Sequence, residues 1–304
     1  MSFTALDVKN LREKTGCGMM DCKKALTETD GDTEKAVEFL REKGLAAAAK
    51  KAGRIAADGF VDCFVDGNVG GIIEVNSETD FVAKNVDFQN FVRACVVTVV
   101  KNNPSSLEEL LEMQLDGANV TVAEAVHEKV LTIGENITIR RFVRAEGSIV
   151  TYIHGGGRIG VMMNFDTNVA TNESFITLAK DLCMQIAAMN PLYLKEDEVP
   201  AEVIEKEKEI LIAQIKEDPK NASKPDNILE KMVFGKIRKY YENNCLLDQV
   251  FVKDNAVKVL AHINAVAKEV GGNITVKSFT RFEKGEGIQK RVDDFAGEIA
   301  SMVK

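Results

Sequence analysis

The chain has 304 residues, of which 45% are hydrophobic and 28% charged, enough for about two domains of roughly 150 residues each. Its formal net charge of −8 argues against a protein held to nucleic acid mainly by phosphate contacts, which needs a basic surplus. It contains no run of about 18 apolar residues and no charged leader followed by an apolar stretch, so we expect a cytoplasmic protein with no membrane partner and no direct nucleic-acid partner.

The first 54 residues predict a three-helix N-terminal domain followed by a linker. Turn residues at 16–18 and 30–32 separate three short helical periods, and Gly44 is expected to end the third. The alanine-rich stretch 45–53 is a plausible helical linker, and the module resembles a ubiquitin-associated domain. Met19 and Met20 follow the first turn and admit two interpretations: an exposed, adaptable protein-binding surface, or filling of the bundle core.

The rest of the chain contains an internal duplication. Asn103-Pro104 aligns with Asn190-Pro191 at an offset of 87, whereas the segment Gly134–Phe142 aligns with Gly271–Phe279 at an offset of 137. The second copy therefore holds an insertion of about 50 residues between Pro191 and Gly271.

Both copies predict the same order of elements: a hairpin of alternating apolar residues, a long amphipathic helix, more helix, and a final strand. This order indicates an α+β fold with small antiparallel sheets backed by helices. We expect a first core subdomain at 55–146 and a second at 147–284.

The insertion, at about 195–245, has a different character. Pro200 suits the first position of a helix, and two narrow apolar stripes follow, separated by a turn at 218–226 that contains Pro219 and Pro225. This pattern predicts an antiparallel helical hairpin, similar to a coiled coil, with arms roughly 25 Å long.

The sequence offers no catalytic or metal-binding constellation. Gly155, Gly157 and Gly160 fit the dinucleotide fingerprint, but strand-like residues lie on both sides, so a hairpin turn is expected in place of a phosphate-binding helix terminus. The three histidines and six cysteines are scattered, without the spacing of a metal site. We therefore expect neither an enzyme nor a bound metal or cofactor.

The segment 79–85, Thr-Asp-Phe-Val-Ala-Lys-Asn, follows a predicted strand and begins a predicted helix. In one interpretation Thr79 or Asp80 caps the helix and Phe81 staples it to the core. In the other, an acid and a bulky aromatic are presented together at the tip of an element. Spacing alone leaves both open.

Several long motifs in the same order resemble the bacterial elongation factor Ts family. They are the segments 15–26, 79–85, 133–137, 154–160 and 285–288, and the similarity runs from the first helix to the last. The resemblance implies a guanine-nucleotide exchange factor that binds elongation factor Tu, in its GDP-bound and nucleotide-free forms, and promotes replacement of GDP by GTP during translation elongation. It also implies a C-terminal helical module at 285–304.

The resemblance assigns roles to particular residues. Thr79, Asp80, Phe81 and Val82 match the stretch that displaces magnesium from the partner. The N-terminal domain, first subdomain and C-terminal module would face the nucleotide domain of the GTPase, and the second subdomain its distal β domain. Secondary partner contacts are expected at Met19, Met20, Ile133, Gly134 and His154. The competing interpretation is a protein-binding adaptor without exchange activity.

Overall fold

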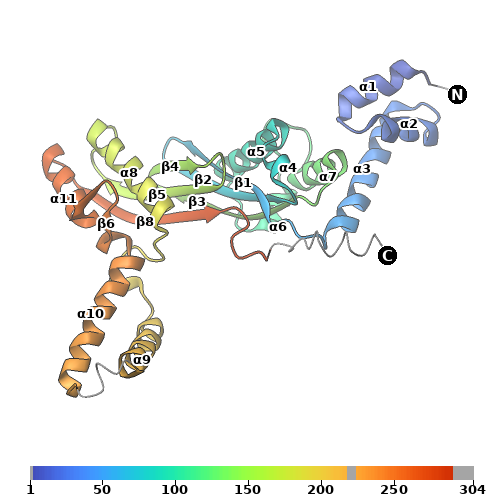
Figure 1. Ribbon diagram of the computed structural model, residues 1–304. Coiled ribbons are helices and arrows are strands. Elements are labelled where there is room, and N and C mark those ends of the chain that lie inside the picture. Colours follow the sequence, from blue (N-terminus) through green and yellow to red (C-terminus); the bar gives the residue numbers. More distant parts are fainter. Residues whose placement is uncertain (1–2, 218–223, 290–304) are drawn as a thin grey trace.

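The computed structural model describes residues 3–217 and 224–289. Over this part of the chain, eleven α-helices and three small antiparallel sheets form an α+β fold, as predicted. Figure 1 shows a helical bundle at one end, a central body of strands covered by helices, and a two-helix arm projecting from the body.

The N-terminal bundle consists of α1 (Ala5–Thr15), α2 (Met19–Glu28) and α3 (Thr33–Lys51). A capping box between Thr4 and Asp7 begins α1, and the Asp32 carboxylate accepts from two backbone N–H groups at the start of α3. The buried residues are Val8, Leu11, Cys17, Cys22, Ala25, Leu26, Ala36 and Leu40. Leu131 of the body packs against them, which joins the bundle to α7 (Val122–Ile133).

The prediction that Gly44 ends the third helix is wrong. Helix α3 continues to Lys51, and a Cβ at position 44 would lie 3.2 Å from the His127 carbonyl oxygen on α7. Glycine therefore serves close packing between two helices at this point and does not act as a stop signal. Helix α3 runs through the alanine-rich stretch as far as Lys51, so most of that stretch is part of the third helix.

The first sheet has the order β1 (Asp58–Asp66), β2 (Val69–Ser77), β3 (Thr138–Glu146). Between β2 and β3 the chain forms α4 (Asp80–Ala83), α5 (Val86–Asn102), α6 (Leu107–Glu112) and α7. A core formed by β2, α5, α7 and the start of β3 includes Phe88, Val92, Val96, Val122 and Ile137, all at most 2% exposed.

The second sheet repeats this arrangement with the order β4 (Ser148–His154), β5 (Ile159–Thr167), β8 (Ile274–Glu283). Helices α8 (Glu173–Met189) and α11 (Val259–Val270) pack on it. The long helices α5 and α8 have matching ends: asparagine caps both at the start (Asn85, Asn172), and a left-handed asparagine follows both at the end (Asn103, Asn190). Of the glycines in the dinucleotide-like motif, Gly155 and Gly157 lie in the β4–β5 turn, as expected for a hairpin, whereas Gly160 lies in β5.

The two sheets pack against each other through a separate apolar cluster formed by Val61, Cys63, Ile72, Met162 and Phe282. A backbone hydrogen bond of 2.8 Å from Val61 N to Gly157 O joins β1 to the β4–β5 turn. The helices therefore lie on the outer faces of a two-sheet core, and the sheet contact fixes the relative placement of the two units.

The inserted segment contains α9 (Ala201–Glu217) and α10 (Asp226–Asn244), the two helices predicted for this region, with short 3-10 turns at Glu196–Glu198 and Leu246–Asp248. Figure 1 shows both helices projecting away from the sheets. A small sheet of β6 (Val250–Phe251) and β7 (Asp254–Lys258) leads back to α11. Most of the predicted turn at 218–226 and most of the helical module expected at 285–304 fall outside the described residues.

Candidate functional site

The segment Glu78–Ala83, called the tip here, follows the last residue of β2 and contains the single turn of α4. Phe81 is 81% exposed, the largest exposed fraction among the large hydrophobic side chains of the described chain. The next two residues, Val82 and Ala83, are 8% and 5% exposed, and Val82 belongs to the core of the first sheet. The tip is therefore anchored by Val82 and Ala83 while the Phe81 ring faces solvent.

This geometry decides between the two interpretations of the tip sequence. Phe81 does not staple the helix to the core. Thr79 occupies the N-cap position of α4, but its side chain makes no capping hydrogen bond and instead donates to Glu135 Oε1 at 2.6 Å. Capping by Thr79 and stapling by Phe81 are therefore wrong, and the aromatic ring and the Asp80 carboxylate are displayed together.

Asp80 is the first helical residue of α4 and carries its charge at the surface. Lys84 Nζ lies 2.6 Å from Asp80 Oδ2, and this hydrogen bond lowers the pKa of Asp80 and raises the pKa of Lys84. A second opposite pair, Lys284 with Asp58, lies near enough for Lys284 also to lower the pKa of Asp80. The tip thus presents an ionised carboxylate beside an apolar ring.

Glu135 holds the base of the tip. Its carboxylate accepts hydrogen bonds from Glu78 N and Thr79 N, both at 3.0 Å, in addition to the bond from the Thr79 hydroxyl. Sequence reasoning did not assign Glu135 a role, although it lies in the 133–137 motif. The sequence signal that could have drawn attention to Glu135 is the glycine before it, because a glycine after an apolar helical period marks the end of a helix, here α7.

The other candidate partner residues lie in three places. Met19 and Met20, at the start of α2, are 56% and 72% exposed, so the core-filling interpretation is wrong for both. Ile133 is partly buried against the first-sheet core, and Gly134 is exposed next to Glu135. His154 is exposed at the β4–β5 turn, where Tyr152 Oη lies 3.0 Å from its Nδ1. Ile133 and Gly134 thus adjoin the tip, whereas the methionines and His154 lie on other elements.

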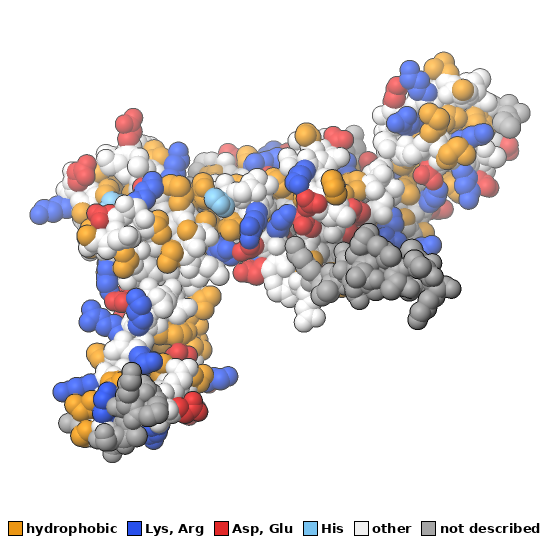
Figure 2. All heavy atoms as spheres, in the orientation of Figure 1, with side chains coloured by type: hydrophobic (Ala, Val, Ile, Leu, Met, Phe, Trp, Pro, Cys, Tyr) orange, Lys and Arg blue, Asp and Glu red, His pale blue; other side chains and the backbone are white. Residues whose placement is uncertain are grey.

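Exposed apolar side chains are not confined to the tip. Figure 2 shows hydrophobic atoms at the surface of the N-terminal bundle and on the projecting arm. On the bundle, Leu6 is 61% exposed, a fraction similar to the 56% of Met19. On the arm, Phe234 of α10 is 74% exposed and lines an open groove of about 460 Å³ between α9 and α10.

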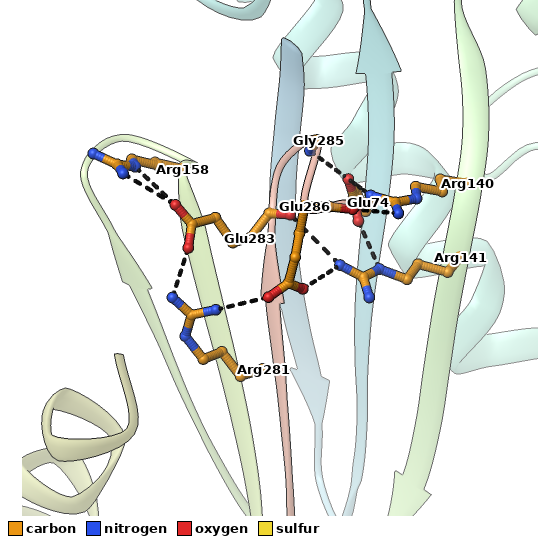
Figure 3. Close-up of polar contacts among 8 residues, drawn as sticks. All are labelled: Glu74, Arg140, Arg141, Arg158, Arg281, Glu283, Gly285 and Glu286. Carbon is orange, nitrogen blue, oxygen red and sulfur yellow. Dashed lines mark hydrogen bonds and ion pairs between the residues drawn. The ribbon is translucent and has the colours of Figure 1, made fainter. Parts of the chain in front are cut away.

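A chain of alternating charges runs from one sheet to the other and includes Glu74 of β2, the strand that leads to the tip (Figure 3). Its members, in order of contact, are Arg158, Glu283, Arg281, Glu286, Arg141, Glu74 and Arg140. Glu74 is fully buried and also accepts from Gly285 N at 2.8 Å. We call this set the Glu74 network.

A β-bulge makes the Glu74 network possible. Glu74 pairs with Arg141 and Val75 with Ile139, so Arg140 is an extra residue without a partner on β2. Adjacent strand residues ordinarily point to opposite faces, but here Arg140 and Arg141 both reach the Glu74 carboxylate, at 3.0 and 2.6 Å. Because Gly285 and Glu286 also join the network, it fixes the point at which the chain leaves β8.

The described residues contain no group of three or more His, Cys, Asp or Glu side chains placed to hold a metal ion. No helix in the same part of the chain has the length and apolar character needed to cross a membrane.

Comparison with known proteins assigns the fold to a family. Residues 78–286 match the family model described as "Elongation factor TS". The chain is 52% identical to elongation factor Ts of Clostridium perfringens (strain ATCC 13124) over 99% of both chains. It is 48% identical to elongation factor Ts of Syntrophotalea carbinolica over the full length of both. With the matched region beginning at the tip and ending at Glu286, this chain belongs to the elongation factor Ts family.

Proposed function

We propose that this protein is the guanine-nucleotide exchange factor of elongation factor Tu, and that its tip displaces the magnesium ion that helps to hold GDP. Family membership implies the exchange role in translation elongation. The observation that carries the finer proposal is the 81% exposure of Phe81 on a turn whose next two residues are buried. A large apolar ring held in water by a rigid anchor is suited to insertion into a partner.

The proposed mechanism uses differential binding without covalent chemistry. Magnesium bridges phosphate oxygens and protein oxygens in near-octahedral geometry, so a wedge that shifts its ligands weakens both ion and nucleotide. Phe81 would provide the wedge, Asp80 would disturb the ion and its water shell, Thr79 would fix the start of the turn, and Val82 would anchor it. This chain then needs no cofactor of its own.

Thermodynamic coupling explains turnover. Whatever weakens nucleotide binding when the factor is bound weakens factor binding equally when nucleotide is bound, so entry of GTP releases the factor. Each tenfold loosening of GDP requires about 1.4 kcal/mol, whereas burial of one Phe contributes roughly 1.5 to 3 kcal/mol. A wide interface must therefore hold the wedge in place.

We assign parts of that interface to the elements described above. The bundle at 1–54, through Met19 and Met20, the first subdomain at 55–146, and the module at 285–304 would face the nucleotide domain of the GTPase. The second subdomain at 147–284 would face the distal β domain, and Ile133, Gly134 and His154 would make secondary partner contacts. No partner contact is assigned to the arm at about 195–245, and the setting proposed is the cytoplasm.

The test is release of a fluorescent GDP analogue from elongation factor Tu. Accelerated release by the full-length chain supports exchange, whereas complex formation without acceleration would establish the adaptor function instead. Binding of the nucleotide by this chain alone would instead support a nucleotide-dependent enzyme that uses the glycine turn. We expect acceleration.

A further inference from the structure

We propose that Glu135 is a positioning residue that holds the tip in its exchange-competent conformation. The inference rests on the proposed function of the tip, but that function by itself does not require any role for Glu135. Glu135 follows Gly134, the residue that caps the end of α7, and helices α4 to α7 separate it from β2 in the sequence. It acts on the partner only through Phe81.

Both oxygens of the Glu135 carboxylate are used on consecutive residues of the tip. Oε2 accepts from Glu78 N and Thr79 N at 3.0 Å each, and Oε1 accepts from the Thr79 hydroxyl at 2.6 Å. Hydrogen bonds to a carboxylate are stronger than those between neutral groups. The three bonds from Glu78 and Thr79 to Glu135 therefore fix the backbone just before Phe81. A neutral amide at position 135 has only one acceptor oxygen, so it would lose part of this set.

The contact is reciprocal, because the tip also binds the segment that carries Glu135. Glu78 Oε1 accepts from Asn136 N at 2.6 Å, and Arg54 Nη1 lies 3.4 Å from the same oxygen. Asn136 Nδ2 in turn donates to Arg54 O at 2.8 Å. Three segments far apart in sequence, the end of α3, the tip and the end of α7, are thereby tied together.

The tip depends on these bonds on its upstream side. Downstream of Phe81, burial of Val82 and Ala83 holds the chain. Upstream, the contacts that do not involve Glu135 are the bond from Ser77 Oγ to Thr79 O at 3.0 Å and the bonds of the Glu78 side chain, and none of these satisfies the N–H groups of residues 78 and 79. Without Glu135, the N–H groups of residues 78 and 79 would exchange their partner for water, and the tip would sample other conformations before insertion. Restricting such freedom in advance is what preorganisation contributes to binding.

The experiment is a double-mutant cycle on GDP release from elongation factor Tu, using the full-length chain. Glu135→Gln should slow release about tenfold, the effect of losing roughly one charge-assisted hydrogen bond. In a Phe81→Ala background the same substitution should change the rate less than about twofold, because the residue through which Glu135 acts is gone. A general loss of structure would slow both backgrounds equally.

Glu124→Gln is the matched control. Glu124 is a carboxylate at the other end of the same helix, where it accepts from Thr121 N at 2.8 Å, and its replacement should leave exchange unchanged. Thr79→Val removes only the hydroxyl donor and supplies a second test, with a smaller slowing, should Glu135→Gln fold poorly.

Two results would overturn the inference while leaving the function of the tip intact: a wild-type rate for both Glu135→Gln and Thr79→Val, or equal slowing by Glu135→Gln in the two backgrounds. A wild-type rate for Phe81→Ala is the separate result that would remove the proposed function itself.

Discussion

Replacing Phe81 by alanine tests the role of the ring without disturbing the fold. The side chain is 81% exposed, so its removal leaves the core intact, and we expect the free energy of unfolding to change by no more than about 0.5 kcal/mol. Any effect on exchange must then come from the partner interface.

The size of the effect follows from the exposed fraction. Full burial of a Phe side chain contributes roughly 1.5 to 3 kcal/mol, and four-fifths of that amount, about 1.2 to 2.4 kcal/mol, is available for insertion. This corresponds to slowing of GDP release by about 8- to 60-fold. Much of the affinity for nucleotide-free elongation factor Tu should remain, because the wide interface is retained.

The assay is stopped-flow release of fluorescent GDP at increasing concentrations of factor, with thermal unfolding of each variant. Phe234→Ala is the control: it deletes the same ring from a site 74% exposed on α10, to which no partner contact is assigned. Equal rates for Phe81→Ala and the wild type, or equal slowing by the two variants, would refute the wedge.

Other variants test other parts of the structure. Met20→Gln should lower affinity for elongation factor Tu in a binding titration without changing thermal stability; unchanged affinity would exclude this surface. Glu74→Ala should lower the free energy of unfolding by about 3 kcal/mol in denaturant titrations. This is the lower end of the cost of removing one partner from a buried ion pair, because Arg140 and Arg141 are about one-third exposed and would be partly solvated. A negligible loss would show that the Glu74 network is dispensable. Asp62 is buried on β1, with its Oδ2 2.9 Å from Arg93 Nε of α5. Burial raises the pKa of Asp62 despite this ion pair, so the free energy of unfolding should fall as pH rises through that pKa, and Asp62→Asn should remove this dependence. An identical pH profile for the variant would contradict it.

Local features were predictable from the sequence because they depend on neighbouring residues. The three N-terminal helices, the β4–β5 turn and the paired helices of the arm follow from caps, glycines and apolar periods. The tip was recognised from its residues, but its two interpretations differed only in where the Phe81 ring points. That direction is set by burial of Val82 and Ala83 in a core formed by distant segments.

Long-range features were not predictable. Gly44 has the signature of a helix end, yet it permits contact with α7, more than 80 residues further along. The contact between Glu135 and Thr79 joins residues 56 positions apart, and the bond from Gly285 to Glu74 spans 211. No local pattern marks such pairs, because each depends on how the two sheets and α7 come together.

The magnesium dependence of exchange tests the central claim most directly. We would measure GDP release from elongation factor Tu with wild type and Phe81→Ala, first in millimolar magnesium and then in excess chelator. The account predicts that the wild-type advantage nearly disappears once the ion has been removed, since the tip then has nothing left to displace. An advantage of the same size under both conditions would contradict it.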